Sequence, residues 1–165
     1  KISELLLALL LKFPLLIEYA VNQLPADQLV GLDNQGIYKG LTIYYNNFVD
    51  YNDFKLWFAG QSGAANLVYA GAGENKKIDQ TAERLKLLDK LALLGDKDFF
   101  DYEYEQAKTE AIKIIITLKK YYLSGKMKEI EKLIARSEEG GNKDETDILM
   151  EKFKMAADEL MAHDS

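Results

Sequence analysis

The sequence contains no cysteine, and this absence removes several classes of chemistry at once. Disulfides, thiolate nucleophiles and cysteine-bound zinc all require the thiol. Histidine is nearly as scarce, since His163 is the only one and lies close to the end of the sequence. A single imidazole, without a thiol or a second imidazole, builds neither a zinc site nor a catalytic triad. We therefore expect no metal site and no cofactor.

Long hydrophobic runs are also missing. The run Leu5–Leu11 is followed closely by Lys12 and Pro14, and it is far shorter than the ~20 apolar residues that cross a bilayer. Glu4 precedes it and no small-residue cleavage site follows it, so a signal peptide is not expected either. We interpret the run as a buried helix and expect no membrane partner.

Positive charge is in deficit as well. The chain carries 21 Lys and Arg against 27 Asp and Glu, a net charge of −6. Proteins bind nucleic acid non-specifically by neutralising phosphates with Lys and Arg, so we expect no direct nucleic-acid partner. The hydrophobic content of 48% and charged content of 29% are typical of a folded globular chain.

Only two prolines interrupt the chain, and its apolar residues recur mostly at helical spacing. From Tyr102 to Glu138 there is no proline and only one glycine, Gly125, which predicts one very long helix. The segment Gly140–Lys143 predicts a break, with Asp144 as the cap of a second helix. A very long helix followed by a second helix indicates a helical hairpin.

Shorter helices are predicted before this point. Ser3 is the expected N-cap of a helix that runs to Lys12, and Gly95 is expected to end a later one. The predicted helices before the long one cover residues 3–12, about 15–23, a stretch capped by Asp27 or Asp33 that runs through Tyr45, and 78–94.

Residues 46–76 are ambiguous, because turn residues alternate there with possible short helices at Phe54–Phe58 and Ala64–Ala70. No stretch shows repeated strand-like alternation between hairpin turns. The sequence therefore predicts an all-α fold. We expect a multi-helix bundle over residues 1–100, the first part of a long connecting helix over 101–124, and a helical hairpin over 125–165.

Three features suggest chemistry but favour a structural interpretation. The triplet Asp96–Lys97–Asp98 resembles a Mg²⁺-binding pair, yet no strand precedes it and no third acidic partner on a sheet is apparent. The segment Gly71–Lys77 lacks the full spacing of a phosphate-binding loop. The aromatic cluster around Trp57 has few basic residues beside it, which favours core packing over base stacking.

The hairpin carries the candidate binding surface. Its apolar stripes are too wide for two helices to bury completely, and methionine is common at adaptable binding surfaces. We expect basic residues to steer the encounter with a partner. The predicted partner-binding residues are Ile130, Ile134, Arg136, Lys143, Leu149, Met150, Phe153, Ala157, Leu160 and Met161.

Several segments, in this order and spacing, carry a resemblance to a known family. They are Leu5–Pro14, Ile37–Leu41, Leu91–Asp101, Leu118–Leu123 and the Lys/Glu-rich hairpin with its Glu151–Lys152–Phe153. Together they resemble the C-terminal helicase-binding domain of bacterial replicative DNA primase, over nearly the whole chain except residues 46–76. The resemblance implies a helical bundle joined through a long helix to a terminal hairpin.

The resemblance also implies a function. The domain would dock onto the N-terminal region of the hexameric replicative helicase and couple priming to unwinding, in the bacterial cytoplasm at the replisome. It implies a non-catalytic chain, since the family's polymerase centre lies in a different part of the full primase. The alternative, of a different class, is a stand-alone scaffold or regulatory domain that self-associates through its hairpin.

Overall fold

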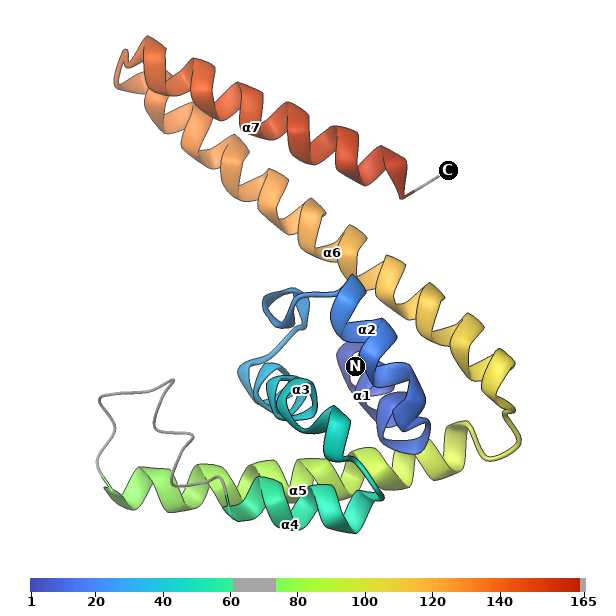
Figure 1. Ribbon diagram of the computed structural model, residues 1–165. Helices are drawn as coiled ribbons and strands as arrows, with labels where there is room; N and C mark the ends of the chain where they lie inside the picture. Colours follow the sequence, from blue (N-terminus) through green and yellow to red (C-terminus); the bar gives the residue numbers. More distant parts are fainter. Residues whose placement is uncertain (61–73, 164–165) are drawn as a thin grey trace. The chain divides into compact units, whose positions relative to one another are not determined.

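The computed structural model describes the backbone of residues 1–60 and 74–163, and the side chains of 1–60 and 82–163. In these ranges every regular element is an α-helix or a short 3₁₀ turn (Figure 1), which confirms the all-α prediction. The chain divides into two compact units, Lys1–Ile115 and Ile116–Ser165. The possible short helix at Ala64–Ala70 lies outside the described residues.

The first unit contains five helices of the described chain and the start of a sixth (Figure 1). The second helix, expected from about residue 15, begins as a 3₁₀ turn at Pro14–Leu16. In the ambiguous segment, the possible short helix at Phe54–Phe58 is part of a longer helix that begins at Tyr51. The elements are α1 (Ile2–Lys12), α2 (Ile17–Gln23), α3 (Leu32–Tyr44), α4 (Tyr51–Gly60), α5 (Glu74–Asp98) and α6 (Tyr104–Glu139).

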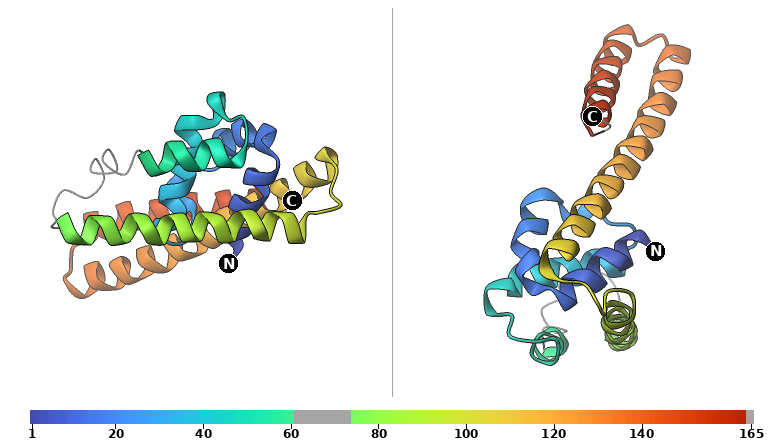
Figure 2. Two further views of the ribbon diagram at one scale, coloured as in Figure 1. Left: turned by 90° about the horizontal axis from the view of Figure 1, so that it is seen from below. Right: turned by 90° about the vertical axis from the view of Figure 1, so that its right-hand side faces the viewer.

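Helix α1 supplies the centre of this unit. Its buried residues lie on all sides of the helix, and a helix that is apolar all round requires neighbours on every face. Helices α3 and α5 both contact it (Figures 1 and 2). The side chains with 0% exposure in α1 are those of Leu6, Leu7, Ala8, Leu9 and Leu10. The predicted burial of the run Leu5–Leu11 is therefore confirmed for its central residues.

Ser3 has a different role from the one predicted. Helix α1 begins at Ile2, its N-cap is Lys1, and no side chain caps it. Ser3 lies inside the helix with 0% exposure, and its hydroxyl oxygen accepts a hydrogen bond from the Val30 amide at 2.8 Å. The hydroxyl thus satisfies a backbone donor just before α3. Neither Asp27 nor Asp33 caps α3, whose N-cap is Gly31 with a φ of 93°.

The crossing of α1 and α5 depends on Gly95. The prediction that Gly95 ends its helix is wrong, because α5 continues to Asp98. A Cβ atom at Gly95 would lie 2.6 Å from the carbonyl oxygen of Ala8, so only glycine permits this approach of the two backbones. Two ion pairs also join the helices, Lys12–Asp96 at 3.2 Å and Glu4–Lys90 at 3.1 Å.

We predict that Gly95→Ala lowers the stability of the first unit. The added methyl group meets a backbone atom that cannot rotate away, and such overpacking costs about 1–3 kcal/mol. Gly36→Ala is the matched control. That glycine is also inside a helix, but its Cβ would meet the Arg84 guanidinium at an ordinary 3.6 Å, so we expect a gain of up to about 1 kcal/mol from helix propensity.

Urea unfolding followed by the fluorescence of Trp57, the only tryptophan, measures both variants in the same unit. Equal effects of the two substitutions would show that the α1–α5 crossing tolerates a side chain.

Aromatic residues of α3, of α4 and of the segment between them form one cluster. Phe54 is fully buried, and the ring of Trp57 stacks on Tyr44 with centroids 4.7 Å apart. Phe48 and Phe58 pack against Phe54 with centroids 5.6 Å apart. The interpretation as core packing is confirmed for Phe54, whereas Trp57 and Phe58 pack against it and are half-buried.

Asp89 of α5 forms hydrogen bonds with two residues of α4. Its carboxylate accepts hydrogen bonds from Lys55 Nζ and from the Tyr51 hydroxyl, each at 2.5 Å. The Lys55 hydrogen bond and then the Tyr51 hydrogen bond lower the pKa of Asp89 below its usual value, with partial burial acting in the opposite direction. Burial and the bond to Asp89 raise the pKa of Tyr51.

A pH-dependent contribution to stability follows. Because the pKa of Asp89 is lower in the folded chain, its contribution is present above the unfolded value of about 3.9 and is lost as pH falls through the folded value. We predict that Asp89→Asn lowers the urea midpoint at pH 7, and that its difference from wild type shrinks as the pH is lowered below about 4. Trp57 fluorescence is again the measurement.

Glu83→Gln, at an exposed carboxylate of the same helix, is the control for this experiment and is expected to leave the midpoint at pH 7 nearly unchanged. If the urea midpoints of Asp89→Asn and wild type differed by the same amount at pH 3 and pH 7, the Asp89 carboxylate would not be the source of the pH-dependent stability.

The boundary between the units falls inside the predicted connecting helix, 101–124. The bundle was expected to end at residue 100, but the first unit extends to Ile115. The reason is that the first turns of α6 bury one face, made of Ala107, Ala111, Ile114 and Ile115. The second unit accordingly begins at Ile116 instead of at residue 125.

The second unit is a helical hairpin of the C-terminal part of α6 and α7 (Lys143–Ala162), which lie side by side (Figures 1 and 2). At the turn Gly141 has a φ of 68°. Its amide bonds to the Glu138 carbonyl and the Asn142 amide to the Ser137 carbonyl, both at 3.0 Å. These two bonds form a Schellman motif, the helix end that the glycines predicted.

Polar side chains hold the turn. Asn142, and not the predicted Asp144, caps α7 by accepting from the Glu145 amide. The Thr146 hydroxyl lies 2.9 Å from that of Ser137, and the Ser137 hydroxyl donates to the Asn142 carbonyl at 2.9 Å. Ser137 and Thr146 are both buried. The two hydroxyls therefore fix one end of the hairpin from inside.

Candidate partner-binding surface

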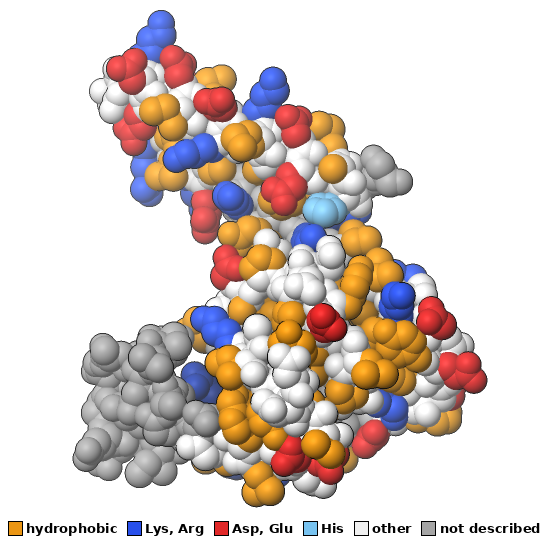
Figure 3. Space-filling view, viewed as in Figure 1, with side chains coloured by type: hydrophobic (Ala, Val, Ile, Leu, Met, Phe, Trp, Pro, Cys, Tyr) orange, Lys and Arg blue, Asp and Glu red, His pale blue; other side chains and the backbone are white. Residues whose placement is uncertain are grey.

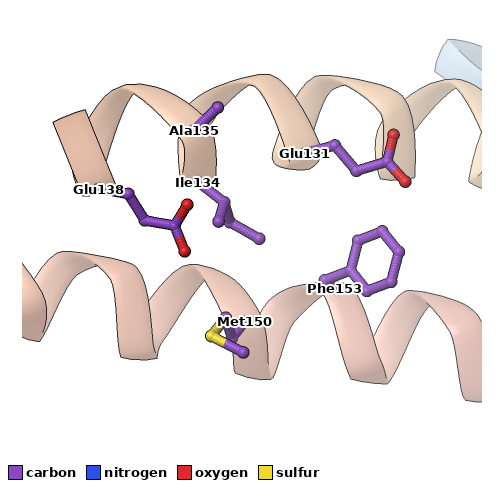
Figure 4. Close-up of a pocket in the computed structure, with 6 residues that line it drawn as sticks. All are labelled: Glu131, Ile134, Ala135, Glu138, Met150 and Phe153. Atoms are coloured by element: carbon purple, nitrogen blue, oxygen red, sulfur yellow. The ribbon is translucent and has the colours of Figure 1, made fainter.

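Helices α6 and α7 border an open, mainly apolar hollow of about 330 Å³. We call it the hairpin hollow; it is lined by Glu131, Ile134, Ala135 and Glu138 of α6 and by Met150 and Phe153 of α7. Figure 4 shows Ile134 at its centre, facing Met150 and Phe153, with Glu138 and Glu131 on either side. Met150 is 55% exposed, so a large apolar side chain lies at the surface here.

The hollow follows from the composition of the two helices. Each helix of a pair can bury only one stripe against the other. Ile130, Leu149 and Ala156 occupy that stripe and are buried. Residues one helical step aside are left at the edge of the contact, where Phe153 and Ile134 are half-buried and Met150 is exposed.

Three of the predicted partner-binding residues, Ile134, Met150 and Phe153, line the hollow. Two others need correction, because Ile130 and Leu149 are 6% and 8% exposed. These two side chains stabilise the hairpin and offer a partner almost no surface. The remaining predicted residues do not line the hollow: Ala157 and Leu160 are half-buried, and Arg136, Lys143 and Met161 are exposed.

Sequence reasoning missed Glu131, Ala135 and Glu138. Their positions relative to Ile134 follow the i, i+3, i+4, i+7 pattern of one helix face. Helical periodicity in a sequence is visible through its apolar residues, so charged residues on the same face, such as the two glutamates, give no signal of their own. The face of the molecule in Figure 3 shows acidic and basic side chains interspersed with hydrophobic ones over the hairpin.

The other candidate sites gain no support. Asp96 and Asp98 are exposed in the last turn of α5, and Asp96 pairs with Lys12. Among the residues that the structure describes, no three His, Cys, Asp or Glu side chains gather as a metal site would require. Gly71 and Gly73 lie outside the described residues. His163 follows the end of α7 as its C-cap.

No helix of the described chain combines the length and the apolar character that a membrane span requires. Comparison of the chain with protein-family models, with curated proteins and with solved structures found no match.

Proposed function

We propose that this chain is a non-catalytic protein-recognition domain that docks onto the N-terminal domain of a hexameric replicative helicase, as the primase domain that its sequence resembles does. In this proposal it brings primer synthesis to the replication fork in the bacterial cytoplasm. The observation that carries the proposal is the hairpin hollow, where apolar side chains of two helices reach the surface together.

The chemistry of the hollow suits a protein partner. An exposed Met150 beside the edge of Phe153 offers apolar area that a partner would remove from water, and each Å² so buried contributes roughly 25 cal/mol. Binding energy in interfaces concentrates in a few such anchors within a desolvated pocket. Methionine suits this position because its unbranched side chain adapts to the surface that it meets.

We predict that Met150→Glu weakens binding of the helicase N-terminal domain by about thirtyfold or more. A charge buried without a partner in an interface costs roughly 2 kcal/mol or more, which converts to that factor. Isothermal titration calorimetry measures the affinity. Circular dichroism should show unchanged helicity, because Met150 is 55% exposed and does not hold the hairpin together.

Met155→Glu is the matched control. It makes the same chemical change on the same helix at a residue that is 67% exposed and does not line the hollow, so we expect wild-type affinity. Equal losses in the two variants would point to a general charge effect. Wild-type affinity in Met150→Glu would place the interface elsewhere and contradict the proposal.

Self-association through the hairpin is the second candidate function, and the same exposed apolar surface favours it. Analytical ultracentrifugation over a wide concentration range separates the two. We expect the isolated chain to stay monomeric. Dimerisation that Met150→Glu abolishes and Met155→Glu preserves would favour the self-associating scaffold instead.

A further inference from the structure

The hairpin hollow combines an apolar floor with an acidic rim. Ile134, Met150 and Phe153 form the floor, and Glu131 and Glu138 flank it (Figure 4). Both glutamates are exposed. Within the described part of the chain, no cation lies at ion-pair distance from either carboxylate. The rim therefore presents two negative charges without counter-ions from the hairpin itself.

The spacing of the rim suggests what fits it. Glu131 and Glu138 are two helical turns apart, about 10 Å along the axis of α6. Ile134 and Ala135 lie midway between them. A partner helix that runs along this face would match the rim with two basic side chains seven positions apart, and it would place an apolar residue from the intervening turn over the floor.

We propose that the hairpin hollow selects an amphipathic helix of the partner protein whose apolar anchor lies between two Lys or Arg residues seven positions apart. This inference rests on the proposed docking function and specifies the chemistry of the partner. It also reassigns steering from Arg136 and Lys143, which do not line the hollow, to the glutamates that do.

Two other occupants fit less well. A second copy of the chain in a two-fold contact would place the same patch on both sides of the interface, so Glu131 and Glu138 of the two copies would face each other and repel. A small molecule would find no buried polar group among the six lining residues to orient it, whereas small-molecule sites depend on a few such groups.

The methionines provide a local probe. All four, Met127, Met150, Met155 and Met161, belong to the Ile116–Ser165 unit. With ¹³C-methyl-methionine labelling, the Met150 signal reports on the hollow, and that of Met155 reports on surface outside it. The titrant is a synthetic amphipathic helical peptide carrying the pattern Lys-x-x-Leu-x-x-x-Lys, and its counterpart carries Glu in place of both Lys.

We expect the Lys peptide to shift the Met150 signal and to leave that of Met155 in place, and the Glu peptide to shift neither. The double variant Glu131→Gln/Glu138→Gln should bind the Lys peptide about fivefold more weakly, the size expected from two partly exposed ion pairs. Glu151→Gln/Glu159→Gln removes the same charge from exposed sites outside the hollow and should bind like wild type.

Three results would overturn the inference: equal binding of the two peptides, no response of Met150 to the Lys peptide, or equal affinities of the two double variants. The salt dependence is a further measure. Affinity of the wild type should fall as salt rises, and the Glu131→Gln/Glu138→Gln variant should lose most of that dependence, because screening acts on exposed charges.

Titration of the helicase N-terminal domain separates this inference from the proposed function. If wild type does not bind that domain while the peptide results hold, the helicase proposal fails and the acidic-rim inference stands. If wild type binds it, Met150→Glu weakens it, and both double variants bind alike, the docking function stands and the acidic-rim inference is wrong.

Discussion

The contact of α1 with α5 is the interaction on which the first unit depends. Each of the four leucines of α1 with 0% exposure contributes roughly 1.5–3 kcal/mol when it is fully buried. The ion pairs that cross the same contact, Lys12–Asp96 and Glu4–Lys90, are partly exposed, and such pairs contribute about 0–1 kcal/mol each. Apolar burial therefore provides most of the stability of this contact. The ion pairs mainly help to set the position of α1 along α5.

That burial requires a side-chain-free position on α5. The Ala8 carbonyl oxygen would lie 2.6 Å from a Cβ at Gly95, so the helices reach this distance only because Gly95 has none. Glycine in a helix costs about 1 kcal/mol relative to alanine. The cost is small beside the burial of the leucines that the close approach permits. A residue that weakens its own helix thus strengthens the packing of the unit.

The hairpin is stabilised differently. Two helices bury only one stripe each. The buried apolar residues described in this unit are Leu118, Leu123, Ile130, Leu149 and Ala156, and the polar Ser137 and Thr146 are buried near the turn. The Schellman motif and the two buried hydroxyls define the turn end with directed bonds. Because the turn fixes where α7 begins relative to α6, the residues that face each other farther along are also fixed. Met150 and Phe153 consequently come to lie opposite Ile134.

The sequence was sufficient for the helices and for the hairpin, since apolar periodicity and paired glycines report on local structure. Prediction from the sequence was wrong at residues whose type is suited to two different structural roles. Gly95 has the same signature whether it ends a helix or admits a neighbouring backbone, and Ser3 is an equally good N-cap or buried acceptor. The role of Gly95 depends on its contact with Ala8, and the role of Ser3 depends on its hydrogen bond with Val30. Both partners are far away in the sequence, so local sequence patterns do not reveal them.

The candidate surface was predictable only in part for a related reason. Periodicity identified the stripes that include Met150 and Phe153, but it could not say which members face the other helix and which lie beside it. Ile130 and Leu149 belong to the first group. The aromatic helix α4 was ambiguous because asparagine and glycine flank it, although Phe54, Trp57 and Phe58 follow the i, i+3, i+4 spacing of one helix face.

Apolar floor and acidic rim have separate consequences for recognition. The floor would supply affinity, yet an apolar surface that includes an exposed methionine accepts many partners. The rim would add little affinity, because exposed charges are screened, but it would penalise any partner that brings acidic side chains to the same place. Discrimination is a difference between affinities, so repulsion of a wrong partner is as effective as attraction of the right one.

Since Glu131 and Glu138 are exposed and support no ion pair among the described residues, they can discriminate between partners without a measurable role in folding. Selection at the hollow can therefore change by substitution of two surface residues while the hairpin that presents it stays intact.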